Sequence, residues 1–259
     1  MLWACMVMEA KIPILAALKT PFRVSAIDRT RARHNWPVME HALVIGASGG
    51  IGRAVAEEWR ARGAVVTGLS RAADGLDVTD PASVARVMGA LDGPYDAVFV
   101  AIGILAPPGS APEKQLAQID PAAMARVFAV NTIGVATILT HLPRLLPRKG
   151  RSVTGVLTAK VGSIGDNRLG GWYSYRASKA ALNQIVHGAA IEIARCHREA
   201  VIAALHPGTV ATPFTQGYDP AYGKTTPEQA ACALCDVMAG LAPAQTGGFF
   251  DYAGHNLPW

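Results

Sequence analysis

The sequence predicts an α/β fold, a single doubly wound parallel sheet with helices on both faces. From residue 41 onward, short apolar runs alternate with segments of helical spacing. This alternation is typical of parallel sheets whose two faces are covered by helices. Hydrophobic residues make up 51% of the chain, aromatic residues make up 7%, and 26 residues are glycine. That composition suits a close-packed α/β protein better than a β-sandwich.

The expected elements follow one another without a long linker or an internal repeat. Asp80-Pro81, Asp120-Pro121 and Thr226-Pro227 indicate helix starts, because Asp and Thr cap helix N-termini and Pro suits the first helical position. We expect strands at residues 41–46, 64–69, 95–101, 152–161, 201–206 and 248–252. We expect helices at residues 51–62, from 81, at 121–142, at 172–197 and at 228–241.

Residues 39–259 are predicted to form one domain, preceded by an extension at residues 1–38. The extension carries six basic and two acidic side chains, a net charge of +4, which leaves about +1 of the chain's +5 for the domain. Its apolar run at residues 12–18 is too short for a membrane span, and it fits a signal peptide poorly. The domain has no basic stripe interleaved with aromatic residues. We therefore expect a cytoplasmic protein that binds neither nucleic acid nor membranes.

Four cysteines, at positions 5, 196, 232 and 235, include one C-x-x-C pair. Such a pair is compatible with a metal or redox site, but no second pair of ligands follows at zinc spacing and the segment reads as an apolar helix. We favour buried structural thiols and expect no metal site.

A glycine-rich segment, Gly46-Ala-Ser-Gly-Gly-Ile-Gly52, lies between the first expected strand and the first expected helix. Glycines are needed in this turn because a pyrophosphate must approach the main chain and the helix N-terminus, where free N–H groups favour negative charge. The placement in the first strand-to-helix turn predicts a Rossmann-type dinucleotide site. Its expected contacts come from Gly46, Ser48, Gly50, Ile51 and Gly52.

The end of the second strand distinguishes NADP from NAD. An acid about 20 residues past the first glycine would bind a ribose 2′-hydroxyl, but the sequence there is Gly68-Leu69-Ser70-Arg71. Ser70 and Arg71 can bind a 2′-phosphate instead, the Arg through a charge-assisted fork. We therefore predict NADP, with NAD as the less favoured cofactor, and expect Asp77 and Val78 at the adenine edge.

Tyr175-Arg-Ala-Ser-Lys179 lies on an expected helix, so the phenol and the ammonium group share one face. Ser163 follows the expected strand at 152–161, at the carboxyl edge where doubly wound sheets bind their ligands. Asn131 falls in the middle of an expected helix, which is unfavourable unless the side chain has a specific role. These four residues are the candidate catalytic group.

Together, Gly46–Gly52, Asn131, Ser163, Tyr175–Lys179 and Pro207-Gly208-Thr209 resemble the short-chain dehydrogenase/reductase family in their order and spacing. The similarity covers about residues 40–259. Within it, residues 161–179 and the terminal Leu257-Pro258-Trp259 resemble the C-factor-like branch of this family.

The resemblance implies a role for each motif residue. Tyr175 would be the general acid or base, Ser163 would hold the substrate oxygen, and Lys179 would lower the phenol pKa and bind the nicotinamide ribose. Asn131 would hold a water in a proton relay. Gly103, Pro207, Gly208, Thr209 and Val210 would line the cofactor, with the last two at the nicotinamide amide. The family's Asn-Asn-Ala-Gly after the third strand reads Val100-Ala-Ile-Gly103 here.

A free phenol has a pKa of about 10, so a pKa near 7 requires about 4 kcal/mol of preferential phenolate stabilisation. An exposed contact with Lys179 would give at most about 1 kcal/mol. We therefore expect Lys179 to act in an enclosed site. An expected lid at residues 213–226 carries Phe214, Tyr218 and Tyr222, which suggests a partly apolar substrate.

The expected function is an NADP(H)-dependent oxidoreductase that reduces a carbonyl or oxidises a secondary alcohol, acting as a homodimer or homotetramer. A nucleotide-binding regulator of the same fold with little turnover is the alternative. A sugar-nucleotide epimerase or dehydratase would need a longer chain and a different glycine spacing.

Overall fold

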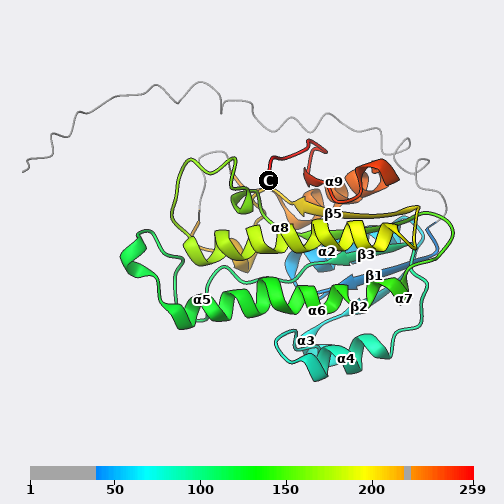
Figure 1. Cartoon of the computed structure of the whole chain (residues 1–259), viewed down its shortest axis with the longest axis horizontal. Coiled ribbons are helices and arrows are strands. Elements are labelled where there is room, and N and C mark those ends of the chain that lie inside the picture. Colours follow the sequence, from blue (N-terminus) through cyan, green and yellow to red (C-terminus); the bar gives the residue numbers. More distant parts are fainter. Residues whose placement is uncertain (1–38, 219–222) are drawn as a thin grey trace, which may run out of the picture.

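The computed structural model describes residues 39–218 and 223–259, so the prediction for residues 1–38 lies outside the described part. A six-stranded sheet, ordered β2-β1-β3-β4-β5-β6 with every neighbouring pair parallel, forms its centre (Figure 1). The strands are β1 His41–Ile45, β2 Val65–Leu69, β3 Ala97–Val100, β4 Ser152–Leu157, β5 Ala200–His206 and β6 Phe249–Asp251. This confirms the predicted α/β class.

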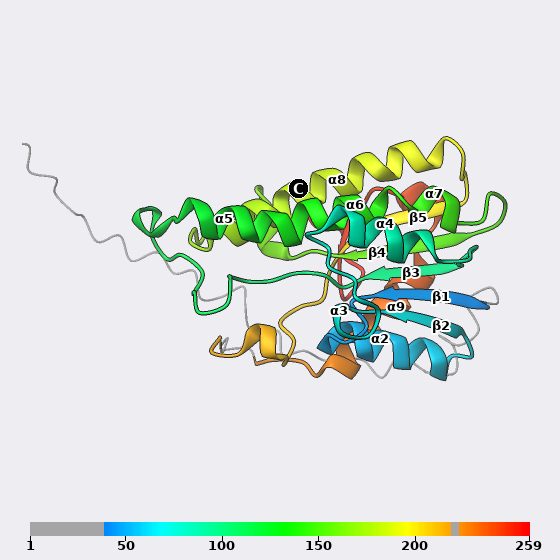
Figure 2. The same ribbon diagram turned by 90° about the horizontal axis from the view of Figure 1, so that it is seen from below.

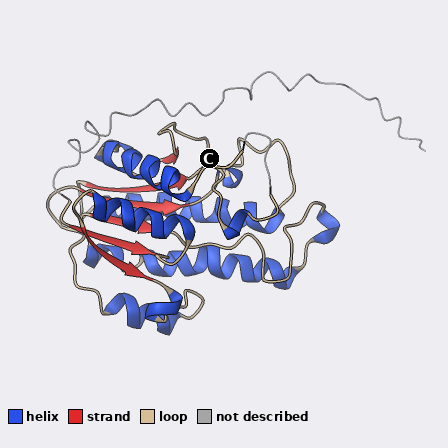
Figure 3. Ribbon diagram, turned by 180° about the vertical axis from the view of Figure 1, so that it is seen from behind, coloured by secondary structure: helices blue, strands red, loops and turns tan. Residues whose placement is uncertain are grey.

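Helices cover both faces of the sheet (Figures 2 and 3). Two of them, α2 (Gly50–Ala61) and α9 (Pro227–Gly240), pack together on one face. The opposite face carries α4 (Pro81–Gly89), α5 (Pro121–Phe128), α6 (Val135–Leu139) and α8 (Tyr173–Ala194), with α7 (Leu142–Leu145) at one end. A short helix, α3 (Arg71–Asp74), follows β2.

Each strand contributes to two cores because successive side chains point to opposite faces. In β1, Leu43 and Ile45 belong to the cluster under α4, α6 and α8, whereas Ala42 and Val44 belong to the cluster under α2 and α9. Trp59 of α2 is fully buried in the second cluster. Strands β1, β3, β4 and β5 are thus buried along most of their length, which explains their largely apolar sequences, whereas the edge strand β2 is partly exposed.

All six strands end at the same edge of the sheet, and every predicted site motif lies on a segment that follows one of these ends. In the sheet, β2 lies on one side of β1 and β3 lies on the other side. Loops after β1 and β3 therefore diverge at that point, which is where open α/β sheets bind ligands.

Two predicted elements differ from the structure by more than small shifts of their ends. β4 ends at Leu157 instead of residue 161, and residues Lys160–Gly162 form a 3₁₀ turn that leads to Ser163. The helix predicted at 121–142 is interrupted by a π-helical segment, Ala129–Gly134, which separates α5 from α6. π-Helical insertions often mark functional sites, and this one contains Asn131.

Within the described residues, one helical segment, Pro121–Leu139, is long and apolar enough to cross a membrane by length and composition, with a mean hydropathy of 1.6. In this fold, its α5 and α6 parts pack against α8. The core helix of a globular domain has the same composition, so the segment needs no membrane to explain it.

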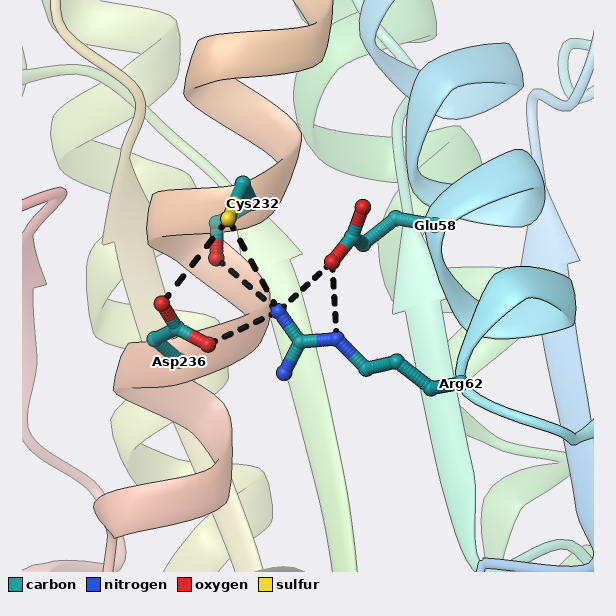
Figure 4. Close-up of polar contacts among 4 residues, drawn as sticks. All are labelled: Glu58, Arg62, Cys232 and Asp236. Carbon is teal, nitrogen blue, oxygen red and sulfur yellow. Dashed lines mark hydrogen bonds and ion pairs between the residues drawn. The ribbon is translucent and has the colours of Figure 1, made fainter. Parts of the chain in front are cut away.

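The C-x-x-C pair lies on α9, and its Cys232 lies beside Arg62 where α2 and α9 meet (Figure 4). Arg62 follows α2 and donates to Asp236 Oδ1 at 2.7 Å and to Glu58 Oε1 at 2.9 Å, and its Nη2 lies 3.9 Å from Cys232 Sγ. Cys235 is fully buried, and burial raises the pKa of its thiol. The expectation of buried thiols is confirmed for Cys235, but Cys232 is only partly buried and Cys196 is exposed; Cys5 lies outside the described residues.

Candidate active site

Tyr175 and Lys179 lie one turn apart in the first two turns of α8. Both are buried, with 6% and 2% of their surfaces exposed. The Tyr175 ring contacts those of Trp172 and Phe214, at centroid distances of 6.3 and 5.8 Å. Burial raises the pKa of the Tyr175 phenol above its usual value. Proton transfer by this phenol near neutral pH would therefore require a partner that stabilises the phenolate.

Lys179 meets the expectation of an enclosed site. Its Nζ donates to the main-chain oxygen of Leu157, the last residue of β4, at 3.0 Å. Gly103 lies beside it, since a Cβ atom at Gly103 would stand 3.3 Å from Lys179 Nζ and 3.4 Å from Asn131 Oδ1. Burial lowers the pKa of Lys179 to about 7. The ammonium group is thus held where its charge is poorly solvated and can interact strongly.

Asn131 is fully buried, and its side chain joins two elements that flank Lys179. Oδ1 accepts from the Ile104 N–H at 2.7 Å, and Nδ2 donates to Ile104 O at 2.9 Å and to Ser178 Oγ at 3.0 Å. The amide therefore clamps the loop after β3 to α8. This explains an Asn within a helix, although its side chain is occupied by protein groups and not directed at open space.

Ser163 ends the turn that follows β4, and only 2% of its surface is exposed. Its Oγ accepts from the Asp166 N–H at 3.0 Å. The turn rests directly on α8, because a Cβ at Gly162 would lie 2.9 Å from both the Cβ and the carbonyl carbon of Lys179. Ser163 and the Tyr175–Lys179 pair are thus brought to the same corner of the sheet.

The glycine loop has the tight geometry predicted for it. Gly46 adopts φ +91°, and a Cβ there would stand 2.5 Å from Ala101 O. A Cβ at Gly52 would lie 2.2 Å from Gly46 O, so the start of α2 packs directly on the turn. Gly49 occupies the N-cap of α2 without a side-chain cap. The first N–H groups of this twelve-residue helix therefore fit an anionic group, with Ser48 exposed beside them.

The loop after β2 places an acid, Asp74, beside Ser70, and this contact was not predicted from the sequence. Ser70 caps α3 by accepting from Ala73 N, and its own N–H donates to Asp74 Oδ2 at 2.7 Å. Arg71 is exposed at the first position of α3. Hydrogen bonds from Thr79 lower the pKa of Asp77. Val78 packs against Gly134 of the π-helical segment.

The segment after β5 lies against the glycine loop. Gly208 adopts φ +77° against the Tyr252 ring, and the Thr209 carbonyl accepts from Thr225 N at 2.9 Å. Pro207 precedes this turn, and Val210 is buried after it. Thr212 comes so close to Gly50 that a Cβ there would stand 2.6 Å from its Cγ2.

The expected lid, residues 213–226, follows this segment. The Phe214 ring lies against Tyr175, and the Tyr218 ring contacts Trp172 at 5.2 Å. Tyr222 lies outside the described residues.

A family model described as short chain dehydrogenase matches residues 40–223. The chain belongs to this family. A dehydrogenase of 1-hydroxy-2-glutathionyl-2-methyl-3-butene from a Rhodococcus strain is 31% identical over 236 residues, which cover 85% of this chain and 100% of that one. The C-signal of Myxococcus xanthus is 36% identical over 145 residues, covering 56% of this chain and 83% of that protein.

Solved structures of family members share the fold. A short-chain dehydrogenase/reductase from Burkholderia multivorans with bound NADP superposes with a TM-score of 0.73 at 26% identity, over 86% of this chain and 100% of that one. A carbonyl reductase from Pseudomonas aeruginosa gives a TM-score of 0.68 at 25% identity, over 85% of this chain and 100% of that one. The oxidoreductase family, inferred from the motifs, and the α/β fold, predicted from the alternating segments, are confirmed.

Two residues of this corner were not predicted from the sequence. Glu113 is a buried acid that contacts the N-terminus of α8, and nothing in its local sequence indicates this contact. Trp172 has φ 51° and its ring lies on Tyr175. The preceding Gly170-Gly171, both with positive φ, is a turn signal that could have indicated an unusual helix start.

Proposed function

We propose that this chain is an NADP(H)-dependent carbonyl reductase, working in reverse as an alcohol dehydrogenase, with Tyr175 as its general acid or base. The main support is the buried Tyr175–Lys179 pair beside Ser163 at the carboxyl edge of the sheet. A phenol and an amine with 6% and 2% exposure are costly to bury, and such groups cluster at functional sites.

The cofactor would lie across the point between β1 and β3 where the order of strands in the sheet reverses. Its pyrophosphate would meet Gly46, Ser48, Gly50, Ile51 and Gly52 at the α2 N-terminus. Its other contacts would come from Ser70, Arg71, Asp77, Val78, Gly103, Tyr175, Lys179, Pro207, Gly208, Thr209 and Val210. Asn131, also predicted to bind the cofactor, is fully buried and would act indirectly, through the loop after β3. NADP in the Burkholderia relative supports the same choice here. The cofactor supplies the hydride for reduction and accepts it in the reverse direction.

In this proposal the protein's residues orient the carbonyl and deliver the proton. Ser163 donates a hydrogen bond to the substrate oxygen, and Tyr175 donates its phenolic proton to the same atom as charge develops there. The Lys179 ammonium stabilises the resulting phenolate, because the enclosed site leaves little water to screen it. Asn131 acts by holding the loop after β3 against α8.

The decisive experiment is steady-state oxidation of NADPH and of NADH with a panel of aromatic and aliphatic ketones and aldehydes. We expect turnover of at least one carbonyl with NADPH and a specific preference for NADPH over NADH. NADPH binding without turnover across the panel would favour a regulator, which is disfavoured here because Ser163, Tyr175 and Lys179 are all present in one corner. Equal kcat/KM with the two cofactors would contradict the NADP assignment.

A further inference from the structure

Glu113 is a buried acid that the proposed reaction does not use. It lies in the loop between β3 and α5, with 8% of its surface exposed. Its carboxylate accepts from the Ser174 N–H at 3.2 Å and from the Ser174 hydroxyl, and its main-chain oxygen accepts from Trp172 N at 2.5 Å. A single residue from a distant segment therefore binds both residues that flank the start of α8.

The start of α8 needs such a partner because its own sequence provides none. Trp172 is the N-cap, and it makes no side-chain capping bond. An indole has no acceptor for the free N–H groups of a first helical turn. Gly170, Gly171 and Trp172 all have positive φ, at 63°, 64° and 51°. This conformation is unfavourable for Trp, and it persists only if neighbouring contacts hold it.

The Glu113 carboxylate supplies what the N-cap lacks. It accepts hydrogen bonds at the first turn of α8 and places a negative charge at the positive end of the helix dipole. A cavity lined by Leu105, Pro112, Glu113, Asp120, Val127 and Ser174 borders this carboxylate. Packing on that side is therefore incomplete, and the hydrogen bonds to Ser174 hold the carboxylate in position.

We propose that Glu113 is a positioning residue for Tyr175. It fixes the first turn of α8 one residue before Tyr175 and keeps the Trp172 ring against the Tyr175 ring. Because its negative charge lies at the residue next to Tyr175, we also expect it to disfavour the phenolate. The loop after β3 is thereby tied to α8 at two points, by Asn131 at Ser178 and by Glu113 at Ser174. This inference rests on the proposed role of Tyr175.

Several other charged side chains lie near this corner. Lys179 and Arg176 lie on α8, and Asp120 lines the cavity. Asp166 lies on the loop after Ser163, and Lys224 lies on the lid segment, where its Nζ donates to Thr215 O. Removing the Glu113 charge leaves all of these in place, so the effect on the phenol can be assigned to Glu113.

The test compares Glu113→Gln, which keeps the shape and one acceptor, with Glu113→Ala, which removes both. In carbonyl reduction, kcat falls at high pH as the coupled Tyr175–Lys179 pair loses its protons. Removing the Glu113 charge lowers the pKa of both groups, so both variants should move this alkaline limb to lower pH by about half a unit. At a temperature where each variant is folded, we expect kcat about tenfold lower in Glu113→Ala and within about threefold of wild type in Glu113→Gln.

Two controls separate positioning from general stability. Ser174→Ala loses one hydrogen bond but keeps the Glu113 charge, so its alkaline limb should stay at the wild-type position. Glu199→Gln alters an exposed carboxylate that accepts from Gly150 N at 3.1 Å, and its kcat and pH profile should both be unchanged.

An alkaline limb that stays at the wild-type pH in Glu113→Gln overturns the proposal, whatever happens to the melting temperature. If Glu113→Ala fails to fold, the isosteric Gln variant still decides. If the wild type reduces no carbonyl, the proposed function fails, and ultraviolet titration of the Tyr175 phenol with NADP⁺ bound still tests Glu113. Tyr175→Phe identifies the signal, and an unchanged midpoint in Glu113→Gln overturns the inference by this route also.

Discussion

Replacing Lys179 with Met should make the protein more stable and less active. The Lys179 ammonium is buried, with one hydrogen bond from Nζ to Leu157 O. Its pKa is lowered to about 7 because burial penalises the charged form. Met has a similar length and no charge, so Lys179→Met removes this penalty with little change in packing.

The size of this stabilisation follows from the lowered pKa of Lys179. Below pH 7, Lys179 is protonated in both states, and the folded state bears the full cost of the buried charge. Between pH 7 and 10.5 the unfolded chain binds more protons at this site, so the penalty fades as the pH rises. A pKa of about 7 in place of 10.5 corresponds to about 4 kcal/mol at pH 7. Loss of the hydrogen bond to Leu157 destabilises the variant by about 1 kcal/mol and reduces this gain in stability.

Urea unfolding of the cofactor-free protein at pH 7, 8, 9 and 10 measures this difference. We expect Lys179→Met to be more stable by about 3 kcal/mol at pH 7, with the gap closing toward pH 10. The matched control is Lys160→Met, since Lys160 is 49% exposed in an ion pair with Asp166 and its removal should leave the pH dependence unchanged. A gap that is absent at pH 7, or that does not narrow as the pH rises, would refute the reasoning.

Four further predictions test the site and the domain. Tyr175→Phe should lower kcat by two to four powers of ten with NADPH affinity retained, measured by steady-state kinetics and cofactor titration, and near-normal turnover would contradict the acid role. Arg71→Ala should remove most of an expected tenfold preference for NADPH, whereas Asp74→Asn should increase it because a carboxylate beside Ser70 repels a phosphate. His206 is half-buried, and desolvation lowers its pKa to about 4. The free energy of unfolding should therefore fall as the pH drops from 6.5 to 4. His206→Asn should reduce that loss by about 2 kcal/mol, measured by acid unfolding. A chain starting at Met39 should keep its melting temperature and NADPH affinity; loss of folded protein would show that residues 1–38 contribute to the domain.

The sequence alone determined the order of elements and the candidate site motifs. Alternating apolar and helical segments predicted the parallel sheet, because strands buried on both faces need uninterrupted apolar residues. Tyr175 and Lys179 could be paired from spacing, since residues four apart share a helix face. Ser163 could be assigned to the same edge because parallel strands all end there. These inferences depend on local periodicity and topology, which short segments encode.

Only the tertiary structure showed how distant segments complete the site. Asn131 lies in a π-helical segment and clamps Ile104 to Ser178. Asp74 folds back onto Ser70 across the start of α3. Glu113 caps a helix that begins 60 residues later in the sequence, at Tyr173. The Asn131 and Glu113 contacts have no period or local motif, because they join segments that packing brings together, whereas the Asp74–Ser70 contact is local and was not predicted. The sequence thus predicted which residues are candidates for the chemistry, whereas the surroundings of those residues, and hence their pKa values, depend on long-range packing.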